Sequence, residues 1–204
     1  MVIAGAGGHS LEVLEILTRN GYLKKDILFF DQDPQKKNQS TSEIQVVSEM
    51  ESIKQHFSNS NFFCLGVGKP ESRKYLYDLL SQEGALYFGL RHESAFYSGS
   101  TSGDFDAFPF SFIGPETTIG LGVLVNTRAH VHHGSTIGDF SEIGPGAMVL
   151  GDAKIGSNCR IGAGAVILPG VELGNGIVVG AGAVVTKSEK SESTLVGVPA
   201  RKIK

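Results

Sequence analysis

The chain of 204 residues contains only two cysteines, Cys64 and Cys159, too few for a disulfide framework or a cysteine-based zinc cluster. Both lie in apolar stretches, so we interpret them as buried free thiols. No apolar run approaches the ~20 residues that a membrane-spanning helix needs. The first residues, MVIAGAGGHS, lack the basic start and long apolar core of a signal peptide. These absences predict a cytoplasmic protein without membrane insertion.

An excess of positive charge is also missing, because the formal net charge is −3 and the pI is about 6.1. This balance argues against a general nucleic-acid or anionic-membrane surface, which needs clustered Lys and Arg. Glycine is abundant instead, with 27 residues, and sixteen of them lie between Ile113 and Thr186. The composition therefore divides the chain, and we predict two domains, at residues 1–90 and 91–204.

The glycine-rich part repeats with a period of six residues. The residue that follows each repeated aliphatic is Gly in eight of twelve cases, and the residue four positions on is never charged or aromatic. A period of six excludes an amphipathic helix and a simple alternating strand. It fits a solenoid of short strands, in which three hexads form one triangular coil and glycine accepts turn conformations closed to other residues. The repeated aliphatics are Ile113, Ile119, Val125, Val131, Ile137, Ile143, Val149, Ile155, Ile161, Ile167, Leu173 and Val179.

The first ninety residues alternate between short apolar runs and helical patterns. MVIA, DILFFD, NFFCLGVG and LYFGL are typical of buried strands, and HSLEVLEILTRNGY, VSEMESIKQHF and ESRKYLYDLLSQEG are typical of helices. This alternation predicts a small parallel α/β sheet. Residues 95–112, where the six-residue phase degrades, are predicted to form an irregular first coil that caps the solenoid.

The segment from Gly5 to Ser10, GAGGHS, is close to the dinucleotide fingerprint, with Ser10 in place of the third glycine. Asp31 ends the second predicted strand, about where such folds place a ribose-binding acid. Ninety residues supply only one mononucleotide half, which favours a single nucleotide over NAD, held by backbone N–H groups at a helix N-terminus. A tight strand-to-helix turn without a ligand is the alternative.

A half-Rossmann domain with GAGGHS, followed by a hexapeptide solenoid that ends in VGVPARKIK, resembles the PglD/NeuD-type sugar acetyltransferases of the hexapeptide-repeat acyltransferase superfamily. The resemblance implies an all-β left-handed parallel β-helix after the α/β domain, a homotrimer, and acetyl-CoA as co-substrate. It implies N-acetylation of a nucleotide-linked amino sugar, with a UDP-linked sugar first. O-acetylation of sialic acid or a related sugar is the alternative. A non-catalytic trimeric scaffold and a γ-carbonic-anhydrase-like metalloenzyme are more distant ones.

The same resemblance assigns the site residues. In VNTRAHVHHG it makes Asn126 and His133 the catalytic residues. Neutral imidazole suits a general base at pH 7, and His133, third in its hexad, is expected to project toward a cleft between subunits. In the first domain the residues expected to hold the nucleotide sugar are Gly8, His9, Asp31, Gly68 and Arg73.

Two departures from the family pattern leave questions open. Gly134 stands where many members place an acid that orients the catalytic His, and Glu142 stands where some carry a second His near the acetyl group. Glu142 of a neighbouring subunit is one candidate for orienting His133, and the roles of His130 and His132 stay open. No further His follows on a neighbouring coil, so no metal site is predicted. Residues expected along the CoA are Glu142, Gly151, Gly162, Ala163, Gly180, Ala181 and Arg201, the last as a partner for phosphate.

Overall fold

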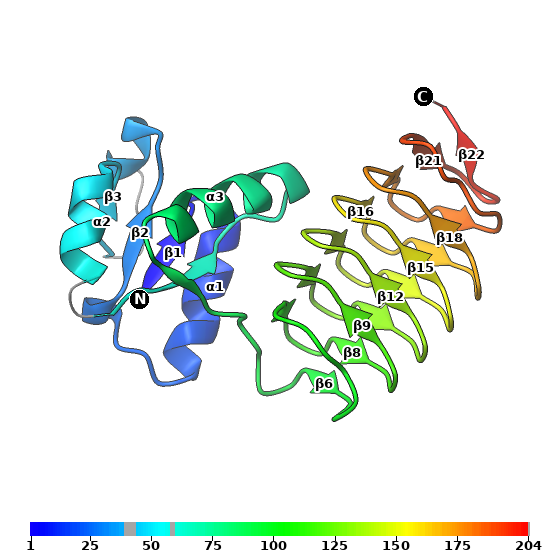
Figure 1. The fold of residues 1–204 in the computed structure, drawn as a ribbon, viewed down its shortest axis with the longest axis horizontal. Coiled ribbons are helices and arrows are strands. Elements are labelled where there is room, and N and C mark those ends of the chain that lie inside the picture. Colours follow the sequence, from blue (N-terminus) through cyan, green and yellow to red (C-terminus); the bar gives the residue numbers. More distant parts are fainter. Residues whose placement is uncertain (39–43, 58–59, 204) are drawn as a thin grey trace. The chain divides into compact units, whose positions relative to one another are not determined.

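The computed structural model describes residues 1–38, 44–57 and 60–203. The chain divides into two compact units. One consists of Met1–Gly68 and Ser72–Leu90, and the other of Lys69–Glu71 and Arg91–Lys204. Figure 1 shows helices around a sheet in the first unit and a stack of short strands in the second.

Within the described residues, the first unit contains a parallel five-stranded sheet in the order β3-β2-β1-β4-β5. The helical expectation for residues 47–57 was partly wrong, because Val46 and Val47 form a strand that pairs with β2 and the helix starts only at Met50. The elements are β1 (Val2–Ala4), α1 (Gly8–Arg19), η1 (Lys24–Asp26), β2 (Leu28–Phe30), η2 (Pro34–Asn38), β3 (Val46–Val47), α2 (Met50–Phe57), β4 (Phe62–Leu65), α3 (Pro70–Gln82) and β5 (Leu86–Tyr87).

The sheet is buried on both faces, as parallel sheets generally are. Ile53 of α2 and Leu80 of α3 pack in one core with strand residues such as Phe63. On the opposite face, α1 buries the stripe Val13, Leu14, Ile16 and Leu17. The strand order reverses between β1 and β4, so the loops that follow these two strands face each other across a topological switch point, where such sheets bind ligands.

The second unit is a three-sided parallel β-helix in the described part of the chain. Successive strands belong to three sheets in turn, named here after β11, β12 and β13. Strands that are three hexads apart pair in register, for example His130 with Met148, Thr136 with Lys154 and Leu124 with Glu142. The sheets are β20-β17-β14-β11-β8-β6 (the β11 sheet), β18-β15-β12-β9 (the β12 sheet) and β22-β21-β19-β16-β13-β10-β7 (the β13 sheet).

In the strands from β8 to β19, the second residue points inward and the first lies on the outer face. The inward residue is the repeated aliphatic, and the small residue four positions later fills the corner, so that Val131, Ala147 and Ile161 are all fully buried. The strands are β6 (Phe96–Tyr97), β7 (Asp106–Ala107), β8 (Phe112–Ile113), β9 (Thr118–Ile119), β10 (Leu124–Val125), β11 (His130–Val131), β12 (Thr136–Ile137), β13 (Glu142–Ile143), β14 (Met148–Val149), β15 (Lys154–Ile155), β16 (Arg160–Ile161), β17 (Val166–Ile167), β18 (Glu172–Leu173), β19 (Val178–Val179), β20 (Val184–Val185), β21 (Thr194–Val196) and β22 (Arg201–Lys202).

The two cysteines are free and buried, which confirms the interpretation of both as buried thiols. Cys159 fills a corner of the β-helix, and its Sγ lies 3.0 Å from the carbonyl oxygen of Gly174 on the next coil. Burial raises the pKa of the Cys159 thiol, which therefore stays protonated at neutral pH. Neither cysteine takes part in the candidate chemistry.

The glycines that directly follow the repeated aliphatics do not adopt the turn conformations expected of them from the sequence. Their role is close approach between coils, because a Cβ at Gly144 would lie 2.6 Å from the carbonyl oxygen of Ile161. The left-handed turn conformation occurs two residues later, and recurs at every sixth position from Phe110 to Gly182. At that position Gly146 has φ of 65° and Asp152 has φ of 60°. The repeat therefore favours glycine at one position for space and at another for conformation.

The β-helix is less regular at its ends. Phe112 and its partner on the following coil, His130, are three hexads apart. Phe112 also pairs with Phe96 on the preceding coil, and these two residues are less than three hexads apart. At the other end Val178 pairs with Thr194, again across less than three hexads, and β22 closes the sheet as an antiparallel strand. No helix in the described part of the chain has the length and apolar content needed to cross a membrane.

Candidate active site

His133 lies at the corner where the chain leaves the β11 sheet and enters the β12 sheet. It follows β11, and its side chain is exposed. The imidazole lies over Gly151 of the next coil, since a Cβ at Gly151 would be only 2.6 Å from Cε1 of His133. Gly151 thus makes room for the ring, and the coil below supports it. An exposed imidazole on a rigid turn has the position that a general base requires.

Two more histidines and an aromatic residue form a cluster beside this corner. The ring centroids of Phe112 and His130 are 5.9 Å apart, those of Phe112 and His132 are 5.7 Å apart, and those of His130 and His132 are 6.1 Å apart. Burial lowers the pKa of His132 below its ordinary value, and the neighbouring His130 and His133 lower it further. His132 is therefore neutral at pH 7. Phe96 continues the strip by stacking on Phe112 at 5.2 Å.

Within one chain, Asn126 and Glu142 both lie away from His133. Asn126 is buried at the opposite end of β11, at the corner between the β13 and β11 sheets, and its Oδ1 accepts a hydrogen bond from the Thr127 N–H at 2.7 Å. Glu142 lies on the outer face of the β13 sheet, where its Oε2 accepts a hydrogen bond from Arg160 Nε at 2.9 Å. Neither side chain meets the imidazole, because a short strand lies between each of them and His133.

Five of the seven residues predicted along the CoA lie at two corners of the β-helix, whereas Glu142 is on the β13 face and Arg201 is at the C-terminal end. Gly151 lies at the His133 corner, and Gly162, Ala163, Gly180 and Ala181 stack at the Asn126 corner, where Gly162 and Gly180 follow strands of the β13 sheet that pair with each other. Their backbones approach the next coil closely, since a Cβ at Gly162 would be 2.6 Å from the Ala181 nitrogen. Ala163 and Ala181 are at least partly exposed beside them. This corner therefore offers main-chain groups with little side-chain cover.

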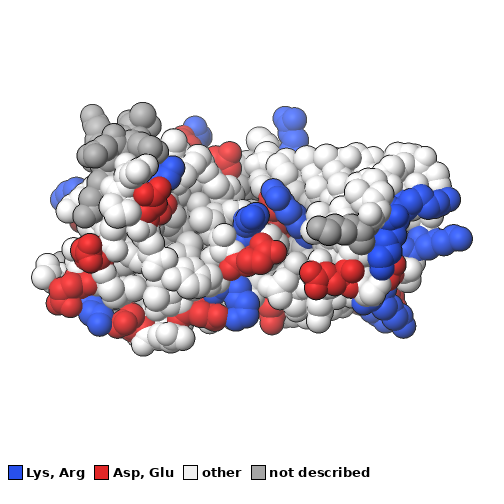
Figure 2. All heavy atoms as spheres, turned by 90° about the horizontal axis from the view of Figure 1, so that it is seen from above, with Lys and Arg blue, Asp and Glu red and all other residues white. Residues whose placement is uncertain are grey.

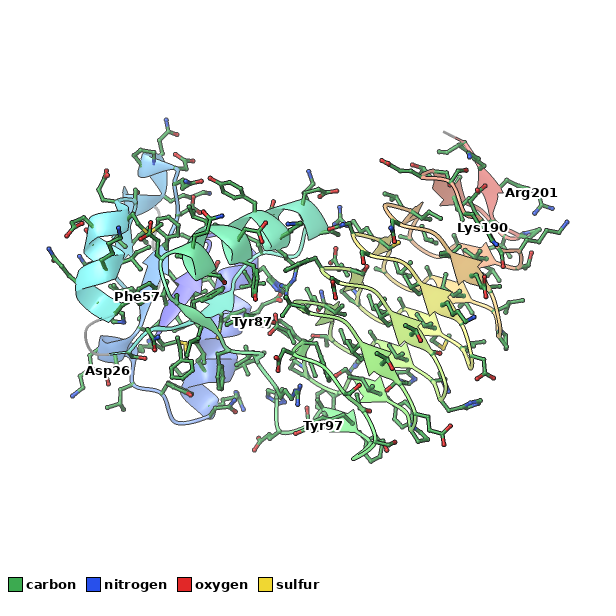
Figure 3. The ribbon with its side chains drawn as sticks, in the orientation of Figure 1. Asp26, Phe57, Tyr87, Tyr97, Lys190 and Arg201 are labelled. Atoms are coloured by element: carbon green, nitrogen blue, oxygen red, sulfur yellow. The ribbon has the colours of Figure 1, made fainter. Side chains whose placement is uncertain are left out.

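Arg201 lies at the C-terminal end of the β-helix, on the exposed strand β22. Its Nη1 donates a hydrogen bond to the Ala200 carbonyl at 3.0 Å. Figure 3 labels Arg201 and Lys190 at this end, and Figure 2 shows Lys and Arg side chains gathered there. Lys187 and Lys202 are exposed too. This positive charge suits an anionic ligand such as a phosphate.

In the first unit, Asp31 closes the loop that follows β1. Its Oδ2 accepts a hydrogen bond from the Ala6 N–H at 2.9 Å, and its Oδ1 accepts one from the Asp33 N–H at 3.0 Å. Helix α1 begins at Gly8 with no side-chain cap and no acidic residue in its first turn. A helix N-terminus of this kind presents backbone N–H groups and a partial positive charge, which favour an anion.

Ser10 takes over the packing role of the missing third glycine. Its Oγ donates a hydrogen bond to the Gly66 carbonyl at 2.9 Å, which ties α1 to the loop after β4. A Cβ at Gly66 would lie 2.6 Å from that hydroxyl, so the close approach depends on glycine at position 66. Sequence reasoning missed this contact, because nothing in the chain order relates two residues so far apart along the sequence.

Arg73, predicted near the nucleotide pocket, is fully buried. Its Nη1 donates a hydrogen bond to the Val67 carbonyl at 2.8 Å, so the side chain supports the loop that contains Gly68. His9 lies on the first turn of α1, where its Nδ1 is 3.2 Å from Glu12 Oε2. The structure thus brings Gly8, His9, Asp31 and Gly68 to the carboxyl edge of the sheet, with Arg73 beneath the last of these loops.

Comparison with known proteins matches both units. Residues 1–80 match the model of the PglD N-terminal domain, and residues 152–187 match that of the bacterial transferase hexapeptide. The chain pairs a PglD N-terminal domain with transferase hexapeptide repeats. The resemblance drawn from the sequence is confirmed, and so is the predicted fold class of an α/β domain followed by a left-handed parallel β-helix.

Solved structures match the chain over nearly its whole length. The acetyltransferase domain of PglB from Neisseria gonorrhoeae, in complex with acetyl coenzyme A, is 27% identical with a TM-score of 0.87, over 99% of this chain and 98% of that one. PerB from Caulobacter crescentus, in complex with CoA and GDP-perosamine, is 26% identical with a TM-score of 0.91, over 100% and 96%. WeeI from Acinetobacter baumannii is 24% identical with a TM-score of 0.83, over 99% and 98%, and supports the fold.

The Neisseria relative is thus an acetyltransferase domain that binds acetyl coenzyme A, and the Caulobacter relative is a perosamine N-acetyltransferase, in agreement with what the resemblance implied. Within residues 1–38, 44–57 and 60–203, the structure holds no group of three or more His, Cys, Asp or Glu side chains able to bind a metal ion.

Proposed function

We propose that the protein transfers the acetyl group of acetyl-CoA to the amine of a nucleotide-linked amino sugar. Residues 1–90 bind the nucleotide sugar, and residues 91–204 bind acetyl-CoA and carry the catalytic residues. The observation that carries this proposal is a match over nearly the whole chain, both units included, to an acetyltransferase domain solved with acetyl coenzyme A and to PerB solved with CoA plus GDP-perosamine.

The chemistry proceeds by direct transfer in a ternary complex. The sugar amine attacks the thioester carbonyl carbon, a C–N bond forms, and the C–S bond breaks to release CoA. His133 accepts the proton that leaves the amine and passes it to the departing sulfur, so the imidazole is neutral again at the end. The N–H groups of Gly162 and Gly180 already donate to the Val179 and Leu195 carbonyls. The main-chain N–H groups of Ala163 and Ala181 at the same corner are therefore the ones suited to stabilise the oxyanion of the tetrahedral intermediate.

The first unit holds the nucleotide through main-chain groups. The uncapped start of α1 at Gly8 receives a phosphate, and Asp31 orders the loop around it through its bonds to Ala6 and Asp33. His9 and Gly68 border the same edge. A UDP-linked sugar is the first choice, and GDP-linked sugars belong in the same test because the Caulobacter relative was solved with GDP-perosamine.

The test is a panel of UDP-, GDP- and dTDP-linked amino sugars, assayed for release of the CoA thiol and for an acetylated product by mass spectrometry. Thiol release that requires one amino sugar supports the proposal. Products resistant to hydroxylamine are amides, and products that hydroxylamine cleaves are esters, which would favour O-acetylation of sialic acid or a related sugar. Absence of acetyl transfer with every sugar would favour the trimeric scaffold instead.

The homotrimer is part of the proposal, because one chain does not bring its own site residues together. His133 and Asn126 lie at different corners, and corners of neighbouring subunits would have to meet to form one site. The outer faces differ in a way that suits this arrangement. The β11 sheet presents Phe96, Phe112 and Met148 outward, whereas the β12 sheet presents Lys154 and Glu172. Sedimentation equilibrium should report three chains, and a monomer at micromolar concentration would contradict the proposal.

A further inference from the structure

The turn that carries His133 lacks an acidic side chain of its own, because Gly134 follows the histidine. A base that accepts a proton becomes an imidazolium, and enzymes commonly stabilise and orient it with a carboxylate. Glu142, the candidate from the sequence, is bound to Arg160 on another face. A carboxylate that reaches His133 within the same chain must therefore come from another residue, and the pairing with Glu142 of a neighbouring subunit stays a prediction.

The next coil places a carboxylate at the missing position. Asp152 stands three hexads after Gly134, so it occupies the same place one coil further along, and both residues adopt the left-handed conformation. The Asp152 N–H donates a hydrogen bond to the His133 carbonyl at 2.9 Å, which joins the two turns. A Cβ at Gly134 would lie in direct conflict with Oδ1 of Asp152. The carboxylate therefore fills the space in which a side chain at position 134 would begin.

The imidazole and this carboxylate interlock between the two coils. The His133 ring extends over Gly151, and the Asp152 carboxylate extends back over Gly134. Each glycine provides the space for a side chain of the other coil. Asp152 is exposed, and among the described residues its carboxylate has no hydrogen-bond or ion-pair partner, so it is available to the neighbouring imidazole.

We propose that Asp152 is the positioning residue of His133, supplying from the adjacent coil the carboxylate that position 134 does not provide. This inference rests on the proposed function, in which His133 is the general base. Rotation of the exposed Asp152 side chain brings its carboxylate toward the ring when the imidazolium forms, as catalytic hydrogen bonds often tighten only with substrate present. The opposite charge then favours the protonated ring.

The other charged and titratable groups around this turn are few in the described structure. His130 and His132 precede it on the same coil, and both would disfavour a positive charge on His133. Glu116 lies at the equivalent position one coil earlier, where Gly134 N donates to the Pro115 carbonyl. Asp152 differs from Glu116 in having its carboxylate located over Gly134. Glu116 is therefore the matched control.

The experiment measures the titration of the His133 imidazole by NMR in the full-length protein labelled at histidine, with its signal identified by loss in His133→Gln. Asp152→Asn keeps a side chain that tolerates the left-handed conformation. We expect its titration midpoint for His133 to fall by about half a unit to one unit, and kcat to fall about three- to tenfold with little change in either KM. Glu116→Gln should shift the midpoint by less than half as much.

A swap variant, Gly134→Asp with Asp152→Gly, should return the midpoint and the pH profile of kcat/KM toward wild type, because the acid then follows His133 directly. An unchanged midpoint in Asp152→Asn, or an equal shift in Glu116→Gln, would overturn the assignment. The NMR readout needs no turnover, so it separates the two proposals. If no sugar is acetylated, the proposed function is wrong. If acetyl transfer is normal and the His133 titration midpoint is unchanged in Asp152→Asn, only the inference about Asp152 is wrong.

Discussion

In the first unit the candidate site consists mainly of main-chain groups, whereas in the β-helix the candidate base is a side chain. In the first unit, the uncapped N-terminus of α1 and the loops after β1 and β4 face the ligand edge, and Asp31 and Arg73 serve by holding those loops. In the β-helix, the main chain repeats from coil to coil, and only the side chains at one corner distinguish His133 from its equivalents. Substitutions should therefore weaken binding in the first unit and slow chemistry in the second.

The largest effect is expected at the base. His133→Ala should lower kcat by ~10²–10⁴, the usual contribution of a positioned general base, with little change in either KM. Steady-state kinetics with both substrates measures this. His132→Ala is the control and should cost much less, because its ring packs against Phe112 and His130. Wild-type kcat in His133→Ala would mean that the mechanism is wrong even with the fold correct.

The regular main chain of the β-helix can be tested through two glycines of one turn. Gly144→Ala should lower the free energy of unfolding by about 2–4 kcal/mol, because the new Cβ meets backbone of the next coil. Gly146→Ala should cost about 1–2 kcal/mol, because a Cβ there has no neighbour within 4 Å and only the left-handed conformation opposes it. Denaturant unfolding compares them, and the reverse order would refute the two roles assigned to glycine.

In the first unit, Asp31→Ala should raise KM for the nucleotide sugar by roughly 10- to 100-fold, since two hydrogen bonds that order the loop are lost. KM for acetyl-CoA and kcat should change far less. Asp31→Asn retains one acceptor oxygen and should show an intermediate value. Equal increases in KM for the nucleotide sugar and in KM for acetyl-CoA would contradict the assignment of nucleotide-sugar binding to the first unit.

The smallest expected effect compares one histidine from each unit. The pKa of His56 is lowered by burial and then by the N-terminal ammonium, and that of His132 is lowered by burial and then by its neighbouring histidines. The unfolded chain binds these protons at higher pH than the folded one, so stability declines as pH falls below the ordinary histidine value of 6.5.

His56→Gln and His132→Gln should each make this acid decline shallower, by about one to two degrees in Tm between pH 7 and 5. Thermal melts across that range measure it, with His92→Gln as the control. A steeper decline in either variant would contradict the sign derived from burial.

The hexad phase was readable in the sequence because each strand contributes one inward aliphatic at a constant interval, and the structure buries every one of the repeated aliphatics. The α/β pattern was also readable, except at Val46 and Val47, where the strand is too short to show an alternation. The candidate residues His133 and Asn126 came from the family resemblance, and their roles stay predictions.

The sequence by itself determined which residues point into the β-helix and which type of fold surrounds them, since both follow from periods within neighbouring residues. Only the tertiary structure decided what meets across coils and loops. Burial of Arg73 against Val67, pairing of Glu142 with Arg160 and placement of the Asp152 carboxylate over Gly134 all join residues whose proximity depends on chain reversals and inter-coil register. The direction of the side chains at those contacts depends on the space that the neighbouring coil or loop leaves open. The spacing of residues along the sequence does not predict that space.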